Sequence, residues 1–328
     1  MGAYQVGIHI MPEKIAILDP GYESYQKERE ILNDYQVEIY QGPHDDIREK
    51  IRFAGEAVGL LIRGTPVNDD FLQQLPALKA IVRYGVGFDN IDLTSCRRHG
   101  VKVSIVQNYG NHAVSDHALA MIYTLGRGIV QGVHSIYSNF AAPPLEEIFE
   151  FHDKTIGIIG LGRIGSTLAL KTKSIFARTI ASDPYLDPVK AEQLQVPLVS
   201  LPQLLAEAQV ISIHCNLTEE TRHLIEQNTF DQMKQKPILV NTARGPIVNE
   251  KDVLTALDAG QIHSYGVDVY EQEPPGPAQK DLIAHPRILA TGHYAWYSEH
   301  SHVLLQIGAA RNLKHLLAGQ EVEDCLNC

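Results

Sequence analysis

The stretch TIGIIGLGRIG, residues 155–165, joins an apolar run to glycines at positions 160, 162 and 165. A strand, this glycine spacing and a following helical pattern are together typical of a turn that binds a dinucleotide pyrophosphate. Gly160 allows a tight turn, Gly162 lets the backbone approach the phosphates, and Gly165 lets the helix pack closely on the strand. The amides at the helix start then face the anion. We therefore predict a dinucleotide-binding domain around this turn.

An acidic residue follows the glycine turn at the spacing of a ribose-binding carboxylate. Asp183 ends the run TIASD and lies 18 residues after Gly165 (183 − 165), close to the expected spacing of about 20. A carboxylate there repels a 2′-phosphate, and the DPY sequence at 183–185 offers no arginine to hold one. We therefore predict NAD as the cofactor in preference to NADP. The alternative is an aspartate that caps a helix in a surface loop.

Two series of short Val- and Ile-rich runs, separated by longer amphipathic segments, predict parallel sheets covered by helices. The first series is KIAILD (14–19), QVEIY (36–40), VGLLIRG (58–64), KAIVRYG (79–85) and VKVSIV (101–106). The second is TIGIIG (155–160), TIASD (179–183), VISIHC (210–215), ILVNTA (238–243), SYGVDVY (264–270) and RILAT (287–291). The fold class is therefore α/β, with two doubly wound parallel-sheet domains.

Three further segments complete this organisation. Residues 112–128 predict a long helix, and residues 139–144 have the most linker-like composition. Residues 300–319 predict a final helix with apolar spacing that packs back on the first domain.

Composition limits the partners and the location of the chain. It has 328 residues, enough for two cores, and a formal net charge of −11. This charge argues against nucleic acid and against an anionic membrane surface. There is no apolar run of about 18 residues and no signal-like start, so we expect no membrane association and a cytoplasmic location.

The four cysteines do not resemble a disulfide framework. Cys325 and Cys328 form the sequence CLNC, a spacing that also suits metal binding or redox chemistry. No second cysteine pair lies nearby, so we expect a frayed end and no metal site.

Polar residues follow three strands of the second series, where a parallel sheet keeps its ligand crevice. Arg244 follows ILV, Asp268 and Glu273 follow SYGV, and His293 follows RILAT. Such a set suits hydride transfer to a 2-oxo acid. Arg244 can bind the carboxylate and polarise the carbonyl, while protonated His293 can donate a proton and Glu273 can favour the imidazolium. Asp268 fits as an acceptor for the nicotinamide amide. The alternative for each residue is a surface ion pair.

The chain resembles the D-isomer-specific 2-hydroxyacid dehydrogenase family along nearly its whole length. The motifs are RYGVGFDNID (83–92), AVSDHALAM (113–121), GIIGLGRIG (157–165), NTARG (241–245), GVDVYEQEP (266–274) and TGHYAWYSE (291–299). It is most similar to the branch of the C-terminal-binding corepressors, through HCNLTEETRHLI (214–225), LVNTARG (239–245) and HYAWYSE (293–299).

The resemblance implies a Rossmann NAD-binding domain, residues 108–298, inserted in a flavodoxin-like substrate domain, residues 1–107 and 299–328. It implies that the catalytic residues are Arg244, Glu273 and His293. It adds cofactor contacts at Arg163, Ile164, Asp183, His214, Cys215, Thr242, Ala243 and Asp268. It also implies substrate contacts at Val86, Gly87 and Tyr109, and a homodimer built through the cofactor domain near the AAPP sequence.

Aromatic residues are candidates to line a substrate pocket, with core or interface packing as the alternative. These residues are Tyr84, Tyr109, Tyr294 and Trp296. The chain also departs from the family pattern. Gly292 replaces a usual proline before His293, Ile105 and Gln107 replace an asparagine and a proline, and Ser115–Asp116 replaces Ala-Glu. These departures bear on substrate identity rather than on the class of reaction.

The motifs and the resemblance are compatible with three functions. The first is NAD-dependent interconversion of a small 2-oxo acid and its D-2-hydroxy acid. The second is an NAD(H)-sensing protein-interaction module of the corepressor type with little or no turnover. The third is oxidation of a smaller donor, as in the similar formate and phosphite dehydrogenases.

Overall fold

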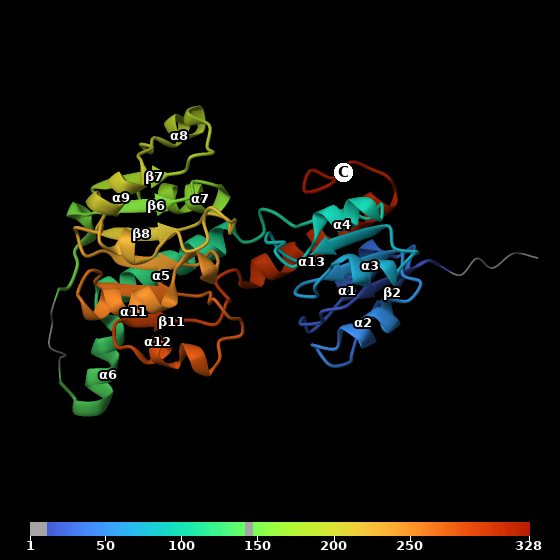
Figure 1. The fold of residues 1–328 in the computed structure, drawn as a ribbon, viewed down its shortest axis with the longest axis horizontal. Coiled ribbons are helices and arrows are strands. Elements are labelled where there is room, and N and C mark those ends of the chain that lie inside the picture. The colour runs from blue at the N-terminus through green and yellow to red at the C-terminus, as the bar shows by residue number, and fades with distance from the viewer. Residues whose placement is uncertain (1–11, 142–146) are drawn as a thin grey trace, which may run out of the picture. The chain divides into compact units, whose positions relative to one another are not determined.

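A computed structural model describes residues 12–141 and 147–328, and the chain divides into two compact units (Figure 1). Unit 1 comprises Met1–Tyr109 and Glu299–Cys328, and unit 2 comprises Gly110–Ser298. The chain passes from unit 1 to unit 2 after Tyr109 and returns to unit 1 after Ser298. The assignment of residues 1–107 and 299–328 to substrate binding and of residues 108–298 to cofactor binding stays a prediction. Most of the AAPP sequence lies outside the described residues.

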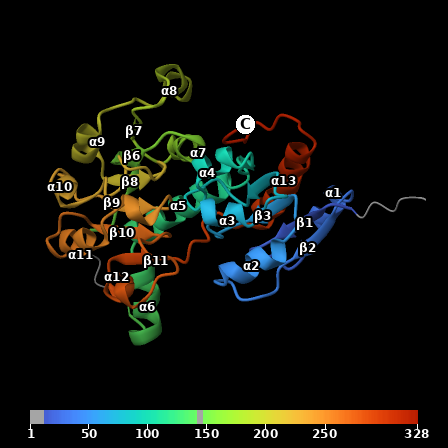
Figure 2. The same cartoon turned by 45° about the vertical axis from the view of Figure 1, so that its right-hand side comes forward.

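Unit 1 is a five-stranded parallel sheet with helices on both faces (Figure 2). Its strand order, β2-β1-β3-β4-β5, is the flavodoxin-like order of doubly wound folds. The strands are β1 Lys14–Ile17, β2 Gln36–Ile39, β3 Gly59–Ile62, β4 Ala80–Arg83 and β5 Lys102–Ser104. The helices are α1 Gln26–Ile31, α2 Ile47–Ala54, α3 Asp69–Gln73, α4 Leu93–Arg98 and α13 Glu299–Leu317.

Successive side chains along these strands point to opposite faces of the unit 1 sheet. Leu60 and Ile62 of β3 pack on one face with Phe71 and Leu72 of α3. Helix α13 contacts α1, β3 and β4, as predicted for the final helix. Burial of such side chains on both faces explains why the strands read as continuous apolar runs.

Unit 2 has a six-stranded parallel sheet in the order β11-β10-β9-β8-β6-β7. The strands are β6 Thr155–Ile159, β7 Arg178–Ser182, β8 Val210–Ile213, β9 Ile238–Asn241, β10 Ser264–Val267 and β11 Ile288–Ala290. A parallel bridge between Ala181 and Leu198 adds a minimal further strand beyond β7. In this strand order β7 lies on one side of β6 and β8 lies on the other, so the order reverses between β6 and β8. Doubly wound folds bind their ligands at such a point.

The helices of unit 2 cover both faces of its sheet. They are α5 Asn111–Gly126, α6 Ile129–Asn139, α7 Arg163–Thr172, α8 Pro188–Leu194, α9 Leu201–Glu207, α10 Gln227–Phe230, α11 Glu250–Asp258 and α12 Lys280–Ala284. The short 3₁₀ helices are Phe151–Asp153, Gly245–Ile247 and Pro277–Gln279. On β6, Ile158 packs in the cluster that contains Met121 of α5, whereas Ile159 packs in the cluster that contains Leu204 of α9.

The end of the chain corrects two expectations from the sequence. Residues 324–328 are ordered against the edge strand β5 instead of frayed, and Cys325 and Cys328 form a disulfide. The order comes from hydrogen bonds that Asp324 and Asn327 make with residues more than 200 positions away. Composition and cysteine spacing carry no signal of such pairing.

Among the described residues, no helix is both long and apolar enough to cross a membrane. The cellular location of the protein stays a prediction.

Candidate active site

The three glycines of the turn after β6 each meet a different environment. Gly160 has a φ of +88°, and a Cβ built on it would lie 2.5 Å from the backbone nitrogen of Cys215. A Cβ on Gly165 would lie 2.1 Å from the carbonyl oxygen of Gly160. A Cβ on Gly162 would meet nothing within 4 Å. The turn is therefore closed on both sides and open at the position where a pyrophosphate is expected.

The start of α7 supplies amide donors beside that open position. Gly162 is the N-cap residue and has no side chain to satisfy the first amides of the helix. Arg163 and Ile164 begin the helix, so their N–H groups have no partner within it. An anion placed there would meet several donors at once. This geometry fits both predicted contacts at the phosphate turn.

Asp183 follows β7 and forms a hydrogen bond with the same turn. Its Oδ2 accepts a hydrogen bond from the amide of Leu161 at 2.9 Å, and its Oδ1 accepts one from the amide of Tyr185 at 3.1 Å. The carboxylate is therefore fixed next to the glycine turn and is only partly buried. This position suits a contact with ribose hydroxyls.

Two buried polar atoms without hydrogen-bond partners in the described residues lie on the loops after β8 and β9. They are His214 Nδ1 and Thr242 Oγ1. His214 Nε2 interacts with Ser212 Oγ at 2.8 Å, and burial lowers the pKa of His214 to about 4. Burial also raises the pKa of the Cys215 thiol to about 11. Neutral polar groups that lack partners fit a site that a nucleotide completes.

The parallel ladder of unit 2 aligns the three strand ends that carry the predicted catalytic residues. Asn241 of β9 pairs with Val267 of β10, and Val267 pairs with Ala290 of β11. The pairing continues past the strands, since the amide of Asp268 donates to Asn241 O and the amide of His293 donates to Asp268 O. Each loop after these strands therefore starts at the same edge of the sheet.

His293 and Glu273 form a direct pair at this edge. His293 Nδ1 lies 2.5 Å from Glu273 Oε2, and Glu273 Oε1 accepts from the amide of Tyr270 at 3.0 Å. Burial raises the pKa of Glu273, but the His293 and Tyr270 hydrogen bonds and the charge of Arg244 lower it by more. The carboxyl group is therefore held ionised beside the imidazole, which leaves His293 Nε2 for another partner.

Arg244 lies close enough to this pair for its charge to act on Glu273. Its guanidinium donates to the carbonyl of Ala243 at 2.7 Å, and Asn241 Nδ2 donates to the carbonyl of Arg244 at 2.9 Å. A Cβ on the next residue, Gly245, would lie 1.9 Å from the carbonyl carbon of Tyr270. The loop after β9 is thus packed tightly against the loop that carries Glu273.

Asp268 organises the loop that carries His293. Its buried carboxylate accepts hydrogen bonds from Thr291 Oγ1 at 2.5 Å, from the Tyr294 amide at 3.2 Å and from the Ala295 amide at 2.9 Å. His293 itself has a φ of +56°, so the loop needs such support. The nicotinamide contact predicted for Asp268 stays a prediction, and the structure adds this structural role.

His117 is a neighbour of the site that was not predicted from the sequence. It lies on α5, and its Nε2 is 3.1 Å from Thr291 Oγ1 and 3.8 Å from Asp268 Oδ1. Burial lowers its pKa, although the charge of Asp268 acts in the opposite direction. Its place in the AVSDHALAM motif was the available signal.

The predicted contacts Val86, Gly87 and Tyr109 belong to unit 1. A Cβ on Gly85, whose φ is +124°, would lie 3.3 Å from the Tyr109 phenol oxygen, so Tyr109 is next to this turn.

Arg63 follows β3 and Arg83 ends β4, so both lie at the carboxyl edge of the same sheet. Neither was predicted from the sequence as a site residue. Their position at the ends of the runs VGLLIRG and KAIVRYG was the available signal.

The prediction that Tyr84 lines a substrate pocket is wrong. Its side chain is 3% exposed, and its hydroxyl donates to the buried carboxylate of Glu28 at 2.8 Å. It is a core residue of unit 1 because α1 supplies this polar partner. Tyr294 is exposed and packs edge-on against His117, and Trp296 packs edge-on against Tyr297. Their contact with substrate stays a prediction.

Comparison with known proteins agrees with the fold described above. The model of the D-isomer specific 2-hydroxyacid dehydrogenase, NAD binding domain, matches residues 119–295. D-3-phosphoglycerate dehydrogenase of Archaeoglobus fulgidus is 32% identical over 296 residues, or 90% of this chain and 56% of that protein. The chain spans about half the length of the curated relatives it matches. Similarity to the corepressor branch stays a prediction.

Two solved structures share the fold over almost their whole length. A protein of Thermus thermophilus superposes with a TM-score of 0.86 at 27% identity, covering 95% of this chain and 99% of that chain. The apo structure of D-lactate dehydrogenase from Escherichia coli superposes with a TM-score of 0.77 at 30% identity, with the same coverage.

Two glycine substitutions separate binding from folding at the phosphate turn. We expect Gly162→Ala to fold normally but to weaken NADH binding by roughly tenfold or more, about 1.4 kcal/mol, because the methyl group occupies the phosphate position. We expect Gly165→Ala to lower stability by about 1–3 kcal/mol, because its Cβ overlaps the Gly160 carbonyl. Fluorescence titration with NADH and thermal unfolding measure the two effects. Unchanged NADH affinity in Gly162→Ala would contradict this assignment.

His214 makes stability depend on pH. The unfolded chain binds a proton at this ring below about pH 6.5, whereas the folded ring stays neutral down to about pH 4. Stability is therefore lost as the pH falls through this window, by about 2 kcal/mol between pH 7 and pH 5. Urea unfolding of His214→Gln should show a pH dependence that is smaller by this amount. Equal pH dependence in both proteins would exclude His214 as the cause.

Proposed function

The chain belongs to the D-isomer specific 2-hydroxyacid dehydrogenase family, and from this premise we propose that it interconverts a small 2-oxo acid and its D-2-hydroxy acid with NAD(H). The observation that carries the proposal is the His293–Glu273 pair with Arg244 beside it, at the carboxyl edge of the unit 2 sheet. The glycine turn and the two polar atoms without partners, on His214 and Thr242, lie on loops at this edge.

Each side chain has a separate role in the proposed reaction. A nicotinamide cofactor bound at the glycine turn would supply the hydride. Arg244 binds the substrate carboxylate through paired N–H donors and stabilises the charge that develops on the carbonyl oxygen. His293 donates a proton from Nε2 to that oxygen, while Glu273 holds the ring through Nδ1 and stabilises its protonated form. In the oxidation direction, the same nitrogen accepts the proton.

We further propose NAD in preference to NADP. Asp183 is held beside the glycine turn by the Leu161 and Tyr185 amides, where its negative charge disfavours a 2′-phosphate. The neighbouring exposed residues Pro184 and Tyr185 carry no positive charge to offset it.

Unit 1 adds a preference for anions to the proposal. Arg63 and Arg83 lie at the carboxyl edge of its sheet, where doubly wound folds bind ligands, so this edge favours an anionic group. The Arg83 Nε donates to the carbonyl of Arg63 at 3.2 Å, and the Arg63 guanidinium carbon lies 5.1 Å from the centre of the Tyr22 ring. D-3-phosphoglycerate, named by the relatives described above, is an acid with two anionic groups and therefore belongs in the substrate panel.

A substrate panel tests the proposed function. The panel comprises D-3-phosphoglycerate, D-lactate and D-2-hydroxyisocaproate, assayed by reduction of NAD and, side by side, by reduction of NADP. We expect turnover of at least one D-acid, none of its L-isomer, and a higher kcat/KM with NAD. Tight NADH binding without turnover of any acid would contradict the proposal and favour the protein-interaction alternative.

Removal of the proposed proton donor tests the chemical step. We expect His293→Ala to lower kcat by about two or more powers of ten, the usual size of general acid–base catalysis, with little change in NADH affinity. His300→Ala, four positions beyond the TGHYAW sequence, is a matched control that should keep its rate. A near wild-type rate in His293→Ala would remove His293 from the mechanism.

We also propose that unit 2 forms a homodimer through α6. This helix presents exposed apolar side chains at helical spacing, which a monomer rarely leaves uncovered. They are Ile129, Val133, Ile136, Tyr137 and, at the C-cap, Phe140. The helix belongs to the cofactor-binding unit, through which the resemblance implies dimerisation.

Sedimentation equilibrium tests the dimer. We expect wild type to sediment as a dimer and Ile136→Asp to shift toward the monomer, because a buried charge in an apolar interface costs several kcal/mol. Ser138→Asp adds the same charge to an exposed position outside this set and should remain dimeric. A monomeric wild type would contradict the proposal.

A further inference from the structure

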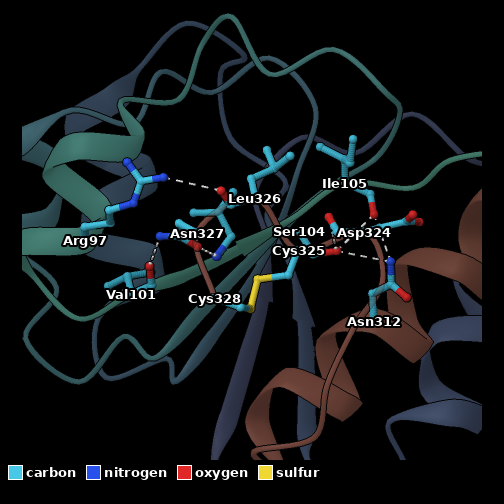
Figure 3. Close-up of a disulfide and its surroundings, with 11 residues drawn as sticks. Arg97, Val101, Ser104, Ile105, Asn312, Asp324, Cys325, Leu326, Asn327 and Cys328 are labelled. Carbon is cyan, nitrogen blue, oxygen red and sulfur yellow. Dashed lines mark hydrogen bonds between the residues drawn. A yellow bond between two sulfur atoms is a disulfide. The ribbon is translucent and has the colours of Figure 1, made fainter. Parts of the chain in front are cut away.

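Residues 324–328, which we call the clamp segment, lie along the edge strand β5 (Figure 3). Cys325 forms an antiparallel bridge with Ser104, and the amide of Leu326 donates to Val103 O at 2.8 Å. The amide of Ile105 donates to Asp324 O at 3.2 Å. The clamp segment thus pairs with backbone groups of an edge that is otherwise open, since β5 is the last strand of its sheet.

Side chains of the clamp segment extend this pairing. Asn327 accepts from the Val103 amide at 2.7 Å and donates to Val101 O at 2.9 Å. Asp324 Oδ2 accepts from the amide of Gln107 at 3.0 Å. Leu326 packs against the apolar cluster of unit 1. The contacts cover β5 from the residue before it to the third residue after it.

The disulfide encloses the two residues that make the central contacts. Cys325 and Cys328 have Cα atoms 5.8 Å apart, a separation usual for a disulfide, with Leu326 and Asn327 between them. Cys325 is partly buried beside β5, whereas Cys328 is exposed. The closed ring restricts the backbone of Leu326 and Asn327 before they dock, and Cys328 is the exposed residue of the pair.

We propose that Cys325 and Cys328 form a thiol–disulfide exchange site that controls docking of the clamp segment on β5. A dithiol reductant opens the site. Its thiolate attacks Cys328 Sγ, and the S–S bond breaks as Cys325 Sγ leaves as a thiolate and takes a proton from water. The second thiol of the reductant then displaces Cys328, so that two electrons and two protons pass to the protein while the reductant becomes a cyclic disulfide.

Loop-closure entropy gives the size of the effect. Opening a ring of four residues releases the restriction on its backbone and changes the ratio of docked to free clamp by roughly twentyfold. Release of the clamp segment also affects the backbone beyond β5, because Asp324 accepts a hydrogen bond from the Gln107 amide. Gln107 lies two residues before Tyr109, where the first segment of unit 1 ends.

Hydrogen–deuterium exchange on the full chain tests the proposal. The oxidised protein is compared with protein reduced by dithiothreitol, and mass spectrometry follows the gain of two hydrogens. We expect peptides covering residues 101–107 to exchange roughly twentyfold faster after reduction, because the Val103, Ile105 and Gln107 amides lose their acceptors for part of the time. Unchanged exchange after verified reduction would overturn the proposal, as would failure of a small-molecule disulfide to re-form the bond.

Three variants make the test specific. The double variant Cys325→Ser/Cys328→Ser should exchange fast with and without dithiothreitol. Asn327→Ala keeps the disulfide but loses two clamp hydrogen bonds, so it should exchange faster than wild type even when oxidised. Cys96→Ala removes a buried thiol of unit 1 outside the clamp and should keep the wild-type response. A redox response that persists in the double variant would overturn the proposal.

Discussion

The site depends on the continuation of the β9–β10–β11 hydrogen-bond ladder past the ends of the strands. The Asp268 amide bonds to Asn241, and the His293 amide bonds to Asp268, so three loops leave the sheet edge in fixed register. Arg244 and Glu273 are within electrostatic reach because of this register. The backbone of parallel strands therefore assembles a cation, a carboxylate and an imidazole from segments nearly fifty residues apart (293 − 244).

Carboxylates hold this region together in two different ways. Glu273 is about one-third exposed and pairs with the titratable ring of His293, so in the proposed reaction it stabilises the protonated ring. Asp268 is almost fully buried and interacts with amides and a hydroxyl, so it fixes the path of the loop. The loop can therefore be ordered although Gly292 replaces the proline that usually precedes the histidine in the family pattern. Three hydrogen bonds to one carboxylate supply the restriction that a proline ring would otherwise give.

The sequence was sufficient to predict the strands, and it indicated which strand ends carry the candidate site residues. Each of the eleven apolar runs overlaps a strand, because burial on both faces of a parallel sheet requires continuous β-branched and aliphatic residues. Arg244, Glu273 and His293 could be chosen because strand ends in such sheets face the ligand crevice. Local patterns are informative in both cases, since the periodicity and the turn residues lie within short windows.

The features that the sequence did not predict arise from contacts between distant segments. His117 and Thr291 are 174 residues apart, and Ser104 and Asp324 are 220 apart. Tyr84 was assigned to a pocket because its buried partner, Glu28, lies on α1, 56 residues away in the sequence. The order of the clamp segment likewise depends on β5 being an edge strand, which only the strand order reveals.

A crystal structure of the protein with NADH and an unreactive analogue of a 2-oxo acid tests the central claim most directly. We predict that the pyrophosphate lies over Gly162 and the first amides of α7, with the analogue carboxylate on Arg244 and its 2-oxygen about 3 Å from His293 Nε2. A nucleotide bound elsewhere, or an analogue that contacts neither Arg244 nor His293, would contradict this claim.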